Sequence, residues 1–116
     1  MKKEPLIFIK HILQNIEDIE TFSKGLSKDN LEKDILRQKA IIRSLEIIGE
    51  AVRNLPDSFK KKHPETPWKD IIGTRDKMIH HYFGVDLDIV WEIIKEEIPK
   101  LKKQVKKILE DENNLQ

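Results

Sequence analysis

The sequence predicts an all-α fold, an up-and-down bundle of four helices. Apolar residues recur at three- and four-residue steps over most of the chain, which is the spacing of one helix face. Gly and Pro are sparse, with 4 and 5 residues among 116, as is typical of long helices joined by few turns. A chain of this length builds one core, so we expect a single domain over residues 1–116.

The first two helices are expected over residues 5–24 and 29–55. The apolar face of the first consists of Ile9, Ile12, Leu13, Ile16, Ile19 and Phe22. That of the second consists of Leu31, Ile35, Ile41, Ile42, Leu45, Ile48, Val52 and Leu55. Gly25 ends the first helix and Pro56 stops the second.

The second half of the chain predicts two more helices after a loop. Residues 56–66 are interpreted as an exposed loop, because the apolar period lapses into polar side chains. A third helix follows over residues 67–83 and a fourth over residues 86–110, with Asp86 as its N-cap. Pro99 lies inside the fourth helix and should kink it or loosen one turn. Four helices joined by short connections favour the up-and-down bundle.

Composition narrows the classes of function. With 22 basic and 21 acidic side chains the net charge is +1, so any contact with nucleic acid must be local. Cysteine is absent, which excludes a disulfide framework and thiolate chemistry and fits a reducing compartment. No apolar run approaches the roughly 20 residues that a membrane span needs. We therefore expect a cytoplasmic protein with no membrane segment.

A polar side chain interrupts the apolar face of the third predicted helix. At about 100° per residue, Arg75 falls among the aliphatic residues, and Tyr82 lies on nearly the same face. Burying a guanidinium without a partner is costly, because it cannot be deprotonated at ordinary pH. Arg75 therefore either pairs with an internal carboxylate, such as Glu46 or Glu50, or lines a cleft that receives an anion.

Two further polar residues lie close to Arg75 in the sequence. Asp76 and His80 are four residues apart and can touch on a helix, so the carboxylate could fix the tautomer of the imidazole and raise its basicity. His80 stands about 140° round the helix from Arg75. The two side chains meet only if the last turn before Gly84 unwinds or if a second subunit completes the site.

An arginine and a histidine suit the cleavage of an RNA phosphodiester. The reaction needs a base for the 2′-hydroxyl, an acid for the leaving oxygen and a cation for the negative charge that develops on the phosphoryl group. No metal is required, because the substrate supplies the nucleophile. A metal site built from Asp76, His80 and His81 is rejected, since adjacent residues on a helix diverge by about 100° and cannot chelate together. We assign His81 no role.

Two segments around this site resemble those of a known family. The segment Pro67–Arg75 reads Pro-Trp-Lys-Asp-Ile-Ile-Gly-Thr-Arg, and His80–Asp86 reads His-His-Tyr-Phe-Gly-Val-Asp. Arg75, His80 and Tyr82 match the motif Arg, four residues, His, any residue, Tyr. Together with Ile47–Ala51, these segments resemble the HEPN superfamily. More narrowly they resemble the HepT-like proteins, which are toxins encoded beside a minimal nucleotidyltransferase antitoxin.

The resemblance implies a four-helix fold and a homodimer with a composite cleft. It implies metal-independent endoribonuclease activity on RNA from Arg75 and His80, with no cofactor. It also implies that the partner nucleotidyltransferase transfers AMP from ATP to Tyr82 and so silences the toxin. The family often has Asn where this chain has Asp76. The added negative charge beside an RNA phosphate would weaken activity or give this position a different orienting role.

Other functions remain open at this point. One alternative is a non-catalytic helical dimer that binds a nucleotidyltransferase and positions its substrate, and a weaker one is a purely structural bundle. The intact set of Arg75, His80 and Tyr82 favours the toxin, whereas Asp76 and the near-neutral charge favour the binding module.

Two groups of lysines are interpreted as solvated faces, with RNA docking as the alternative. The first group is Lys60, Lys61 and Lys62, and the second is Lys100, Lys102, Lys103, Lys106 and Lys107.

Overall fold

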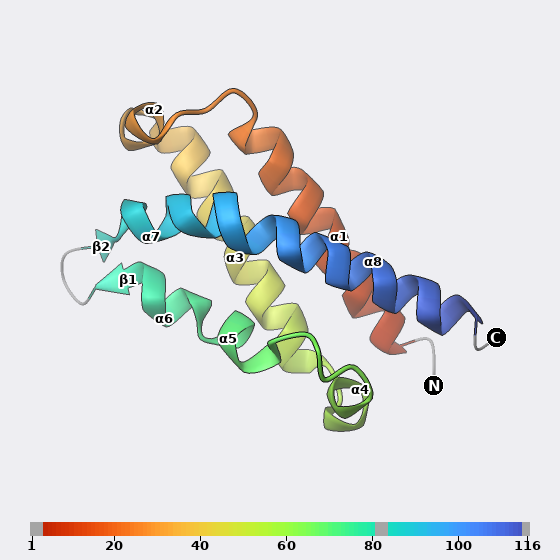
Figure 1. The fold of residues 1–116 in the computed structure, drawn as a ribbon. Helices are drawn as coiled ribbons and strands as arrows, with labels where there is room; N and C mark the ends of the chain where they lie inside the picture. The colour runs from red at the N-terminus through yellow and green to blue at the C-terminus, as the bar shows by residue number, and fades with distance from the viewer. Residues whose placement is uncertain (1–3, 81–83, 115–116) are drawn as a thin grey trace.

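The computed structural model describes residues 4–80 and 84–114, which form the predicted all-α bundle (Figure 1). In chain order the elements are α1 (Glu4–Ser23), α2 (Lys28–Lys33), α3 (Ile35–Asn54), α4 (Asp57–Lys62), α5 (Trp68–Ile72), α6 (Thr74–Met78), β1 (Ile79–His80), β2 (Gly84–Val85), α7 (Leu87–Glu92), the π-helical segment η2 (Ile93–Glu97) and α8 (Ile98–Asn114). Helices α1 and α3 run side by side in opposite directions, and α8 packs against α1. Among the described residues, no helix combines the length and the hydropathy that a membrane crossing requires.

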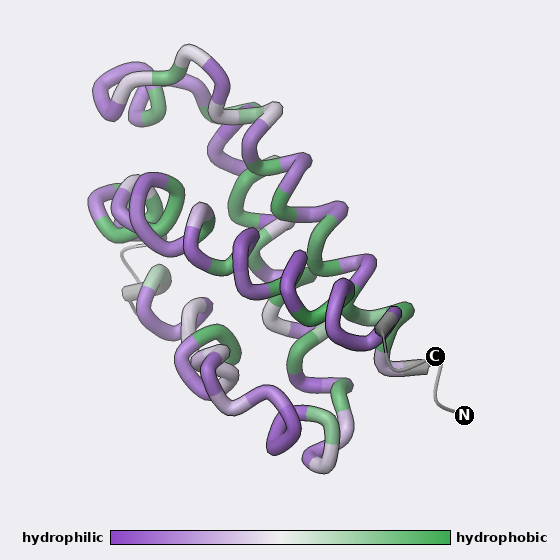
Figure 2. The backbone as a smooth tube through the Cα atoms, turned by 45° about the vertical axis from the view of Figure 1, so that its right-hand side comes forward, coloured by the Kyte–Doolittle hydropathy of each residue, from purple (hydrophilic) through white to green (hydrophobic). Residues whose placement is uncertain are grey.

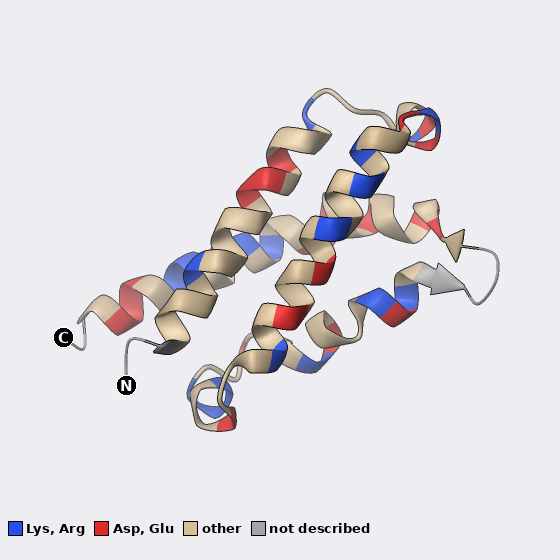
Figure 3. Ribbon diagram, turned by 180° about the vertical axis from the view of Figure 1, so that it is seen from behind, with Lys and Arg blue, Asp and Glu red and all other residues tan. Residues whose placement is uncertain are grey.

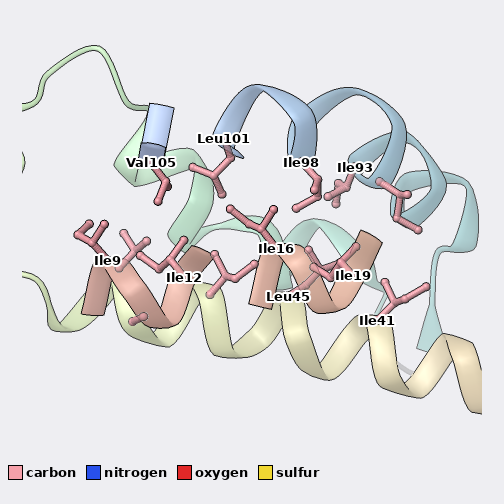
Figure 4. Packing of buried hydrophobic residues seen from close by; sticks show 14 of the residues in the cluster. Ile9, Ile12, Ile16, Ile19, Ile41, Leu45, Ile93, Ile98, Leu101 and Val105 are labelled. Atoms are coloured by element: carbon pink, nitrogen blue, oxygen red, sulfur yellow. The ribbon is translucent and has the colours of Figure 1, made fainter. Parts of the chain in front are cut away.

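The core lies where α1, α3 and the η2–α8 helix meet (Figure 4). One face of α1 is completely buried and consists of Ile9, Ile12, Ile16 and Ile19. Opposite it lie Ile41 and Leu45 of α3 and Ile93, Ile98, Leu101 and Val105 of η2 and α8. Apolar and polar positions alternate along each long helix at the helical period (Figure 2). The apolar residues whose spacing predicted these helices are therefore the residues that pack in the core.

The second predicted helix, residues 29–55, is two helices in the structure. Asp34 ends α2 and begins α3, and its side chain accepts a hydrogen bond from the backbone amide of Arg37 at 3.1 Å. The side chain of Gln38 donates to the carbonyl of Leu31 at 2.7 Å, which satisfies one of the last acceptors of α2. An Asp side chain that caps a helix competes with helix continuation, and here the cap overrides the apolar period.

Residues 56–66, predicted as an exposed loop, contain helix α4. Phe59 and His63 are buried, one helical turn apart. The indole N–H of Trp68 donates to the carbonyls of Lys60 and His63 at 3.1 and 3.0 Å. The prediction was wrong because the run of exposed lysines masks the apolar period of a short helix. The other side of this helix faces the core through Phe59.

The third predicted helix, residues 67–83, is shorter and divided. Helix α5 is capped at Gly73, and α6 ends at Met78. The chain then enters β1, which pairs antiparallel with β2. The register places Ile79 opposite Val85 and His80 opposite Gly84. Gly84 has a φ of 82°, in the left-handed region that favours glycine, so this residue stabilises a hairpin where a continuous helix was predicted.

The fourth predicted helix, residues 86–110, is continuous, but its middle is π-helical where the flanking parts are α-helical. Asp86 caps it as expected, accepting hydrogen bonds from the amides of Asp88 and Ile89 at 3.0 and 3.2 Å. Proline lacks an amide hydrogen, and its ring collides with the carbonyl four residues earlier in an α-helix. The wider π-helical turn η2, just before Pro99, relieves that collision. The loosened turn predicted at Pro99 is therefore present.

Candidate functional site

The segment that contains Arg75 and Asp76 is the short helix α6, which rests on α3 and α7. Met78 at its end is completely buried. The hydroxyl of Thr74 donates to the carbonyl of Asp70 at 3.0 Å and joins the start of α6 to α5. The helix therefore presents Arg75 and Asp76 to solvent from a fixed base.

Arg75 points outward, whereas the helical projection predicted that it occupies the apolar face. Its side chain is 66% exposed, and its Nε lies 3.2 Å from Oε2 of Glu46 on α3. The break at Gly73 shifts the helical phase, so Met78 and not Arg75 takes the buried position. The ion pair with Glu46, one of the open alternatives, is present. Because Glu46 pairs with the Nε side, the opposite edge of the guanidinium can bind an anion through two N–H groups.

Glu46 belongs to a row of charges on the exposed face of α3 (Figure 3). Arg43 Nη1 lies 4.0 Å from Oε1 of Glu46 and 3.9 Å from Oε1 of Glu50. Within the described part of the chain, Glu50 pairs with Arg43 but not with Arg75. Glu46 is thus the acidic residue that links Arg75 to α3. Sequence reasoning named it only as a structural partner.

Asp76 is exposed on α6. Asp76 and His80 do not share one helix, as the sequence predicted, because α6 ends at Met78 and the backbone of His80 lies in β1. The side chain of His80 and all of residues 81–83, Tyr82 included, lie outside the described residues. The helix nevertheless unwinds before His80, which is one of the two conditions under which Arg75 and His80 were expected to approach each other.

A groove of about 430 Å³ lies between α5 and α6 on one side and η2 and α8 on the other. Its aliphatic lining consists of Leu45, Ile48, Ile71, Ile89, Ile93, Ile98 and Leu101. Lys77 of α6 and Lys100 of α8 also line it, together with the carboxylates of Asp70, Glu92 and Glu97. No sequence pattern indicated this groove, because it is assembled from elements that are far apart in the chain. Among the residues that the structure describes, no cluster of three or more His, Asp or Glu side chains could hold a metal ion.

A second polar cluster joins α4 to the end of α8. His63 is only 4% exposed, and its Nε2 lies 2.8 Å from Oε2 of Glu112. Lys62 Nζ lies 3.0 Å from the same oxygen. Burial raises the pKa of the Glu112 carboxyl, but hydrogen bonds from His63 and Lys62 outweigh burial and hold the pKa below its usual value. We call these three residues the α4–α8 clasp.

Comparison with known proteins identifies a family. The family model described as ribonuclease HepT-like matches residues 12–108. A protein of Caldanaerobacter subterraneus subsp. tengcongensis, named as a candidate RNase, is 53% identical over 95% of this chain and 98% of its own. A Methanocaldococcus jannaschii protein, also named as a candidate RNase, is 44% identical over 98% of each chain. A Thermococcus cleftensis protein named "Probable ribonuclease HepT" is 44% identical over 93% of this chain and 98% of its own. No solved structure matches at a comparable significance. The chain belongs to the ribonuclease HepT-like family.

Proposed function

We propose that the chain is a metal-independent endoribonuclease and the toxin of a toxin–antitoxin pair. The family match over residues 12–108 and the names of the relatives support a ribonuclease. The observation that carries the proposal is the placement of Arg75. This cation is 66% exposed, is held at Nε by Glu46, and lies on the helix that leads directly into His80.

In the proposed reaction, Arg75 and His80 act on one phosphodiester. Arg75 binds the non-bridging oxygens and offsets the negative charge that builds up on them in the transition state. His80 removes the proton of the 2′-hydroxyl, whose oxygen attacks the phosphorus while the bond from phosphorus to the 5′-oxygen breaks. The 5′-oxygen takes up a proton from an imidazolium. The products are a 2′,3′-cyclic phosphate and a 5′-hydroxyl, and no step requires a metal.

We propose that Asp76 orients the imidazole and that the active form is a homodimer. Asp76 is exposed on the same short helix as Arg75, and a carboxylate there can accept the ring N–H of His80 and fix its tautomer. A second subunit would add a second His80 to a composite cleft. One imidazole would then serve as base while the other, protonated, serves as acid.

Regulation is proposed to act at Tyr82, through AMP transfer from ATP by a cognate nucleotidyltransferase antitoxin. The new phosphodiester would add a negative charge seven residues after Arg75 in the sequence, and it would compete with the RNA phosphate for the guanidinium. Tyr82 is the one tyrosine among the 116 residues, so a tyrosine-linked AMP can have no other position. Coexpression with the partner should add the mass of AMP, and Tyr82→Phe should abolish the addition. An unmodified Tyr82 beside an active partner and ATP would contradict this regulation.

The catalytic proposal is tested by cleavage of single-stranded RNA in the presence of EDTA. Arg75→Ala and His80→Ala should each lower the rate by about 100-fold or more, because each removes a charge-stabilising or proton-transferring group. Arg37→Ala is the matched control, because Arg37 is an exposed arginine of α3 that pairs with Asp34 and not with Glu46. It should retain most of the activity. Loss of wild-type cleavage in EDTA, or unchanged cleavage in both variants, would reject the mechanism.

A further inference from the structure

The first nine residues of α8 after Ile98 concentrate positive charge. The segment from Pro99 to Lys107 contains five lysines and no acidic residue, whereas the whole chain has a net charge of +1. The remainder of the chain is therefore net acidic. A local cationic surface on a protein whose remainder is net acidic is suited to binding a polyanion at that surface.

Four of these lysines are available to a partner. Lys102 is not, because its Nζ lies 2.8 Å from Glu20 of α1 and its side chain is only 27% exposed. The others are exposed and have no carboxylate within ion-pair distance in the described part of the chain. We call Lys100, Lys103, Lys106 and Lys107 the lysine face.

The lysine face is held on a rigid support. Leu101 and Val105, on the opposite side of α8, are buried in the core. The α4–α8 clasp fixes the helix again at Glu112. Lys100 and Lys107 are seven residues apart, so the face extends for about 10 Å along the helix axis. Cations fixed on a rigid helix lose less conformational freedom on binding than cations on a loop.

The lysine face begins beside the candidate site. Lys100 lines the groove to which α6 contributes Thr74 and Lys77, the neighbours of Arg75 and Asp76. A phosphate chain bound at Lys103 and Lys107 can thus continue past Lys100 to Lys77 on α6, the helix that also carries Arg75. The carboxylates of Asp70, Glu92 and Glu97 also line this groove, so the phosphates would contact its two lysines and stay away from these acidic side chains.

We propose that the lysine face binds the sugar–phosphate backbone of single-stranded RNA and delivers it to α6, an inference that rests on the proposed ribonuclease function. The large hydrophobic residues that are exposed among the described positions are Ile7, Ile35 and Leu36, none of them on α8. A protein interface would need an apolar centre, and membrane insertion would need an apolar face. A purely cationic face fits a backbone of phosphates, bound without sequence preference.

The test measures binding to a single-stranded RNA with 2′-O-methyl groups, which lacks the nucleophile and so stays intact. The dissociation constant is measured over a series of salt concentrations for the wild type and for the triple variant Lys103→Gln, Lys106→Gln and Lys107→Gln. Each lost phosphate contact lowers the slope of log K against log salt by about 0.7. In the triple variant the magnitude of this slope should therefore be smaller than in the wild type by about 2. The variant should also bind the RNA on the order of tenfold to a hundredfold more weakly at 0.1 M salt.

The matched control carries the same change in net charge elsewhere. Lys10, Lys33 and Lys39 are exposed on α1, α2 and α3, and their replacement by Gln should leave the slope within about 0.5 of the wild type. Equal losses in both triple variants would mean that only net charge matters and would overturn the proposal. An unchanged slope in the test variant would also overturn it and leave an acidic protein as the next partner to examine. Cleavage of ordinary RNA is measured separately, so a wild type that binds but does not cleave rejects the enzyme and not the docking face.

Discussion

At the scale of single residues, Arg75 combines a fixed position with an open binding edge. A free arginine side chain loses about 2 kcal/mol of rotamer entropy when it becomes ordered. The pair between Arg75 Nε and Glu46 accounts for part of that ordering before any substrate arrives. Glu46 therefore has the geometry of a positioning residue for the proposed reaction, because it acts on the substrate only through Arg75.

Replacing Glu46 tests this role. Glu46→Gln removes the charge and keeps the shape, and we expect kcat on RNA to fall by about three- to tenfold with a smaller change in KM. The reason is that a charge-assisted hydrogen bond at a partly exposed site contributes only about 1 kcal/mol. Steady-state kinetics with a short RNA gives both constants.

Glu50→Gln is the control for that measurement, because Glu50 lies one turn further along α3 and pairs with Arg43 instead. It should leave kcat unchanged. If Glu46→Gln and Glu50→Gln have the same effect, then the charge row acts as a whole and Glu46 has no special relation to Arg75. In an Arg75→Ala background, Glu46→Gln should have no further effect on the rate.

At the scale of elements, the helices with one unbroken apolar face were predictable, and the interrupted ones were not. The buried isoleucines of α1 keep the helical period from Ile9 to Ile19, and the structure follows it. The predicted second and third helices instead divide at Asp34 and Gly73. Periodicity reports which residues face the core, but a cap or a glycine changes the direction of the backbone without disturbing that pattern.

The hairpin after α6 should depend on Gly84. Its φ of 82° is strained for a residue with a side chain, although an added Cβ would meet no atom within 4 Å. Gly84→Ala should therefore lower the free energy of unfolding by about 1–2 kcal/mol through backbone strain alone. Urea unfolding followed by circular dichroism measures this difference.

Gly49 provides the opposite case for comparison. It lies inside α3, where an added Cβ would sit 3.7 Å from the carbonyl oxygen of Ile71, an ordinary contact distance. Gly49→Ala should stabilise the protein by about 0.5–1 kcal/mol, because alanine loses less backbone entropy in a helix. Destabilisation by both substitutions to the same extent would show that packing, and not backbone conformation, dominates at these glycines.

At the scale of the whole molecule, the fold class and the family were predictable from the sequence, and the arrangement of the candidate site residues was not. Arg75 was identified because a cation interrupted an apolar period, yet the structure turns it outward. The groove beside α6 and the burial of His63 come from elements brought together by the fold, which no local spacing encodes. The resemblance around Arg75 identified the family, whereas the geometry of the site required the fold.

The α4–α8 clasp predicts how the whole molecule responds to acid. The pKa of Glu112 is lower in the folded chain than its ordinary value of 4.5. The interactions of Glu112 with His63 and Lys62 therefore stabilise the fold fully above about pH 4.5, and this contribution is lost as the pH falls through the lowered pKa. Glu112→Gln should reduce the melting temperature at pH 7 by several degrees, which corresponds to about 1–2 kcal/mol.

The difference in melting temperature between the wild type and Glu112→Gln should shrink as the pH is lowered from 7 to 3, because the wild-type carboxyl also becomes neutral. Glu110→Gln removes a charge from an exposed position of the same helix and should change the melting temperature by less than about 1 °C across this range. A difference for Glu112→Gln that stays constant down to pH 3 would mean that packing of the side chain, and not its charge, joins α4 to α8. In that case the lysine face would still rest on a helix fixed at its end, but its support would be insensitive to pH.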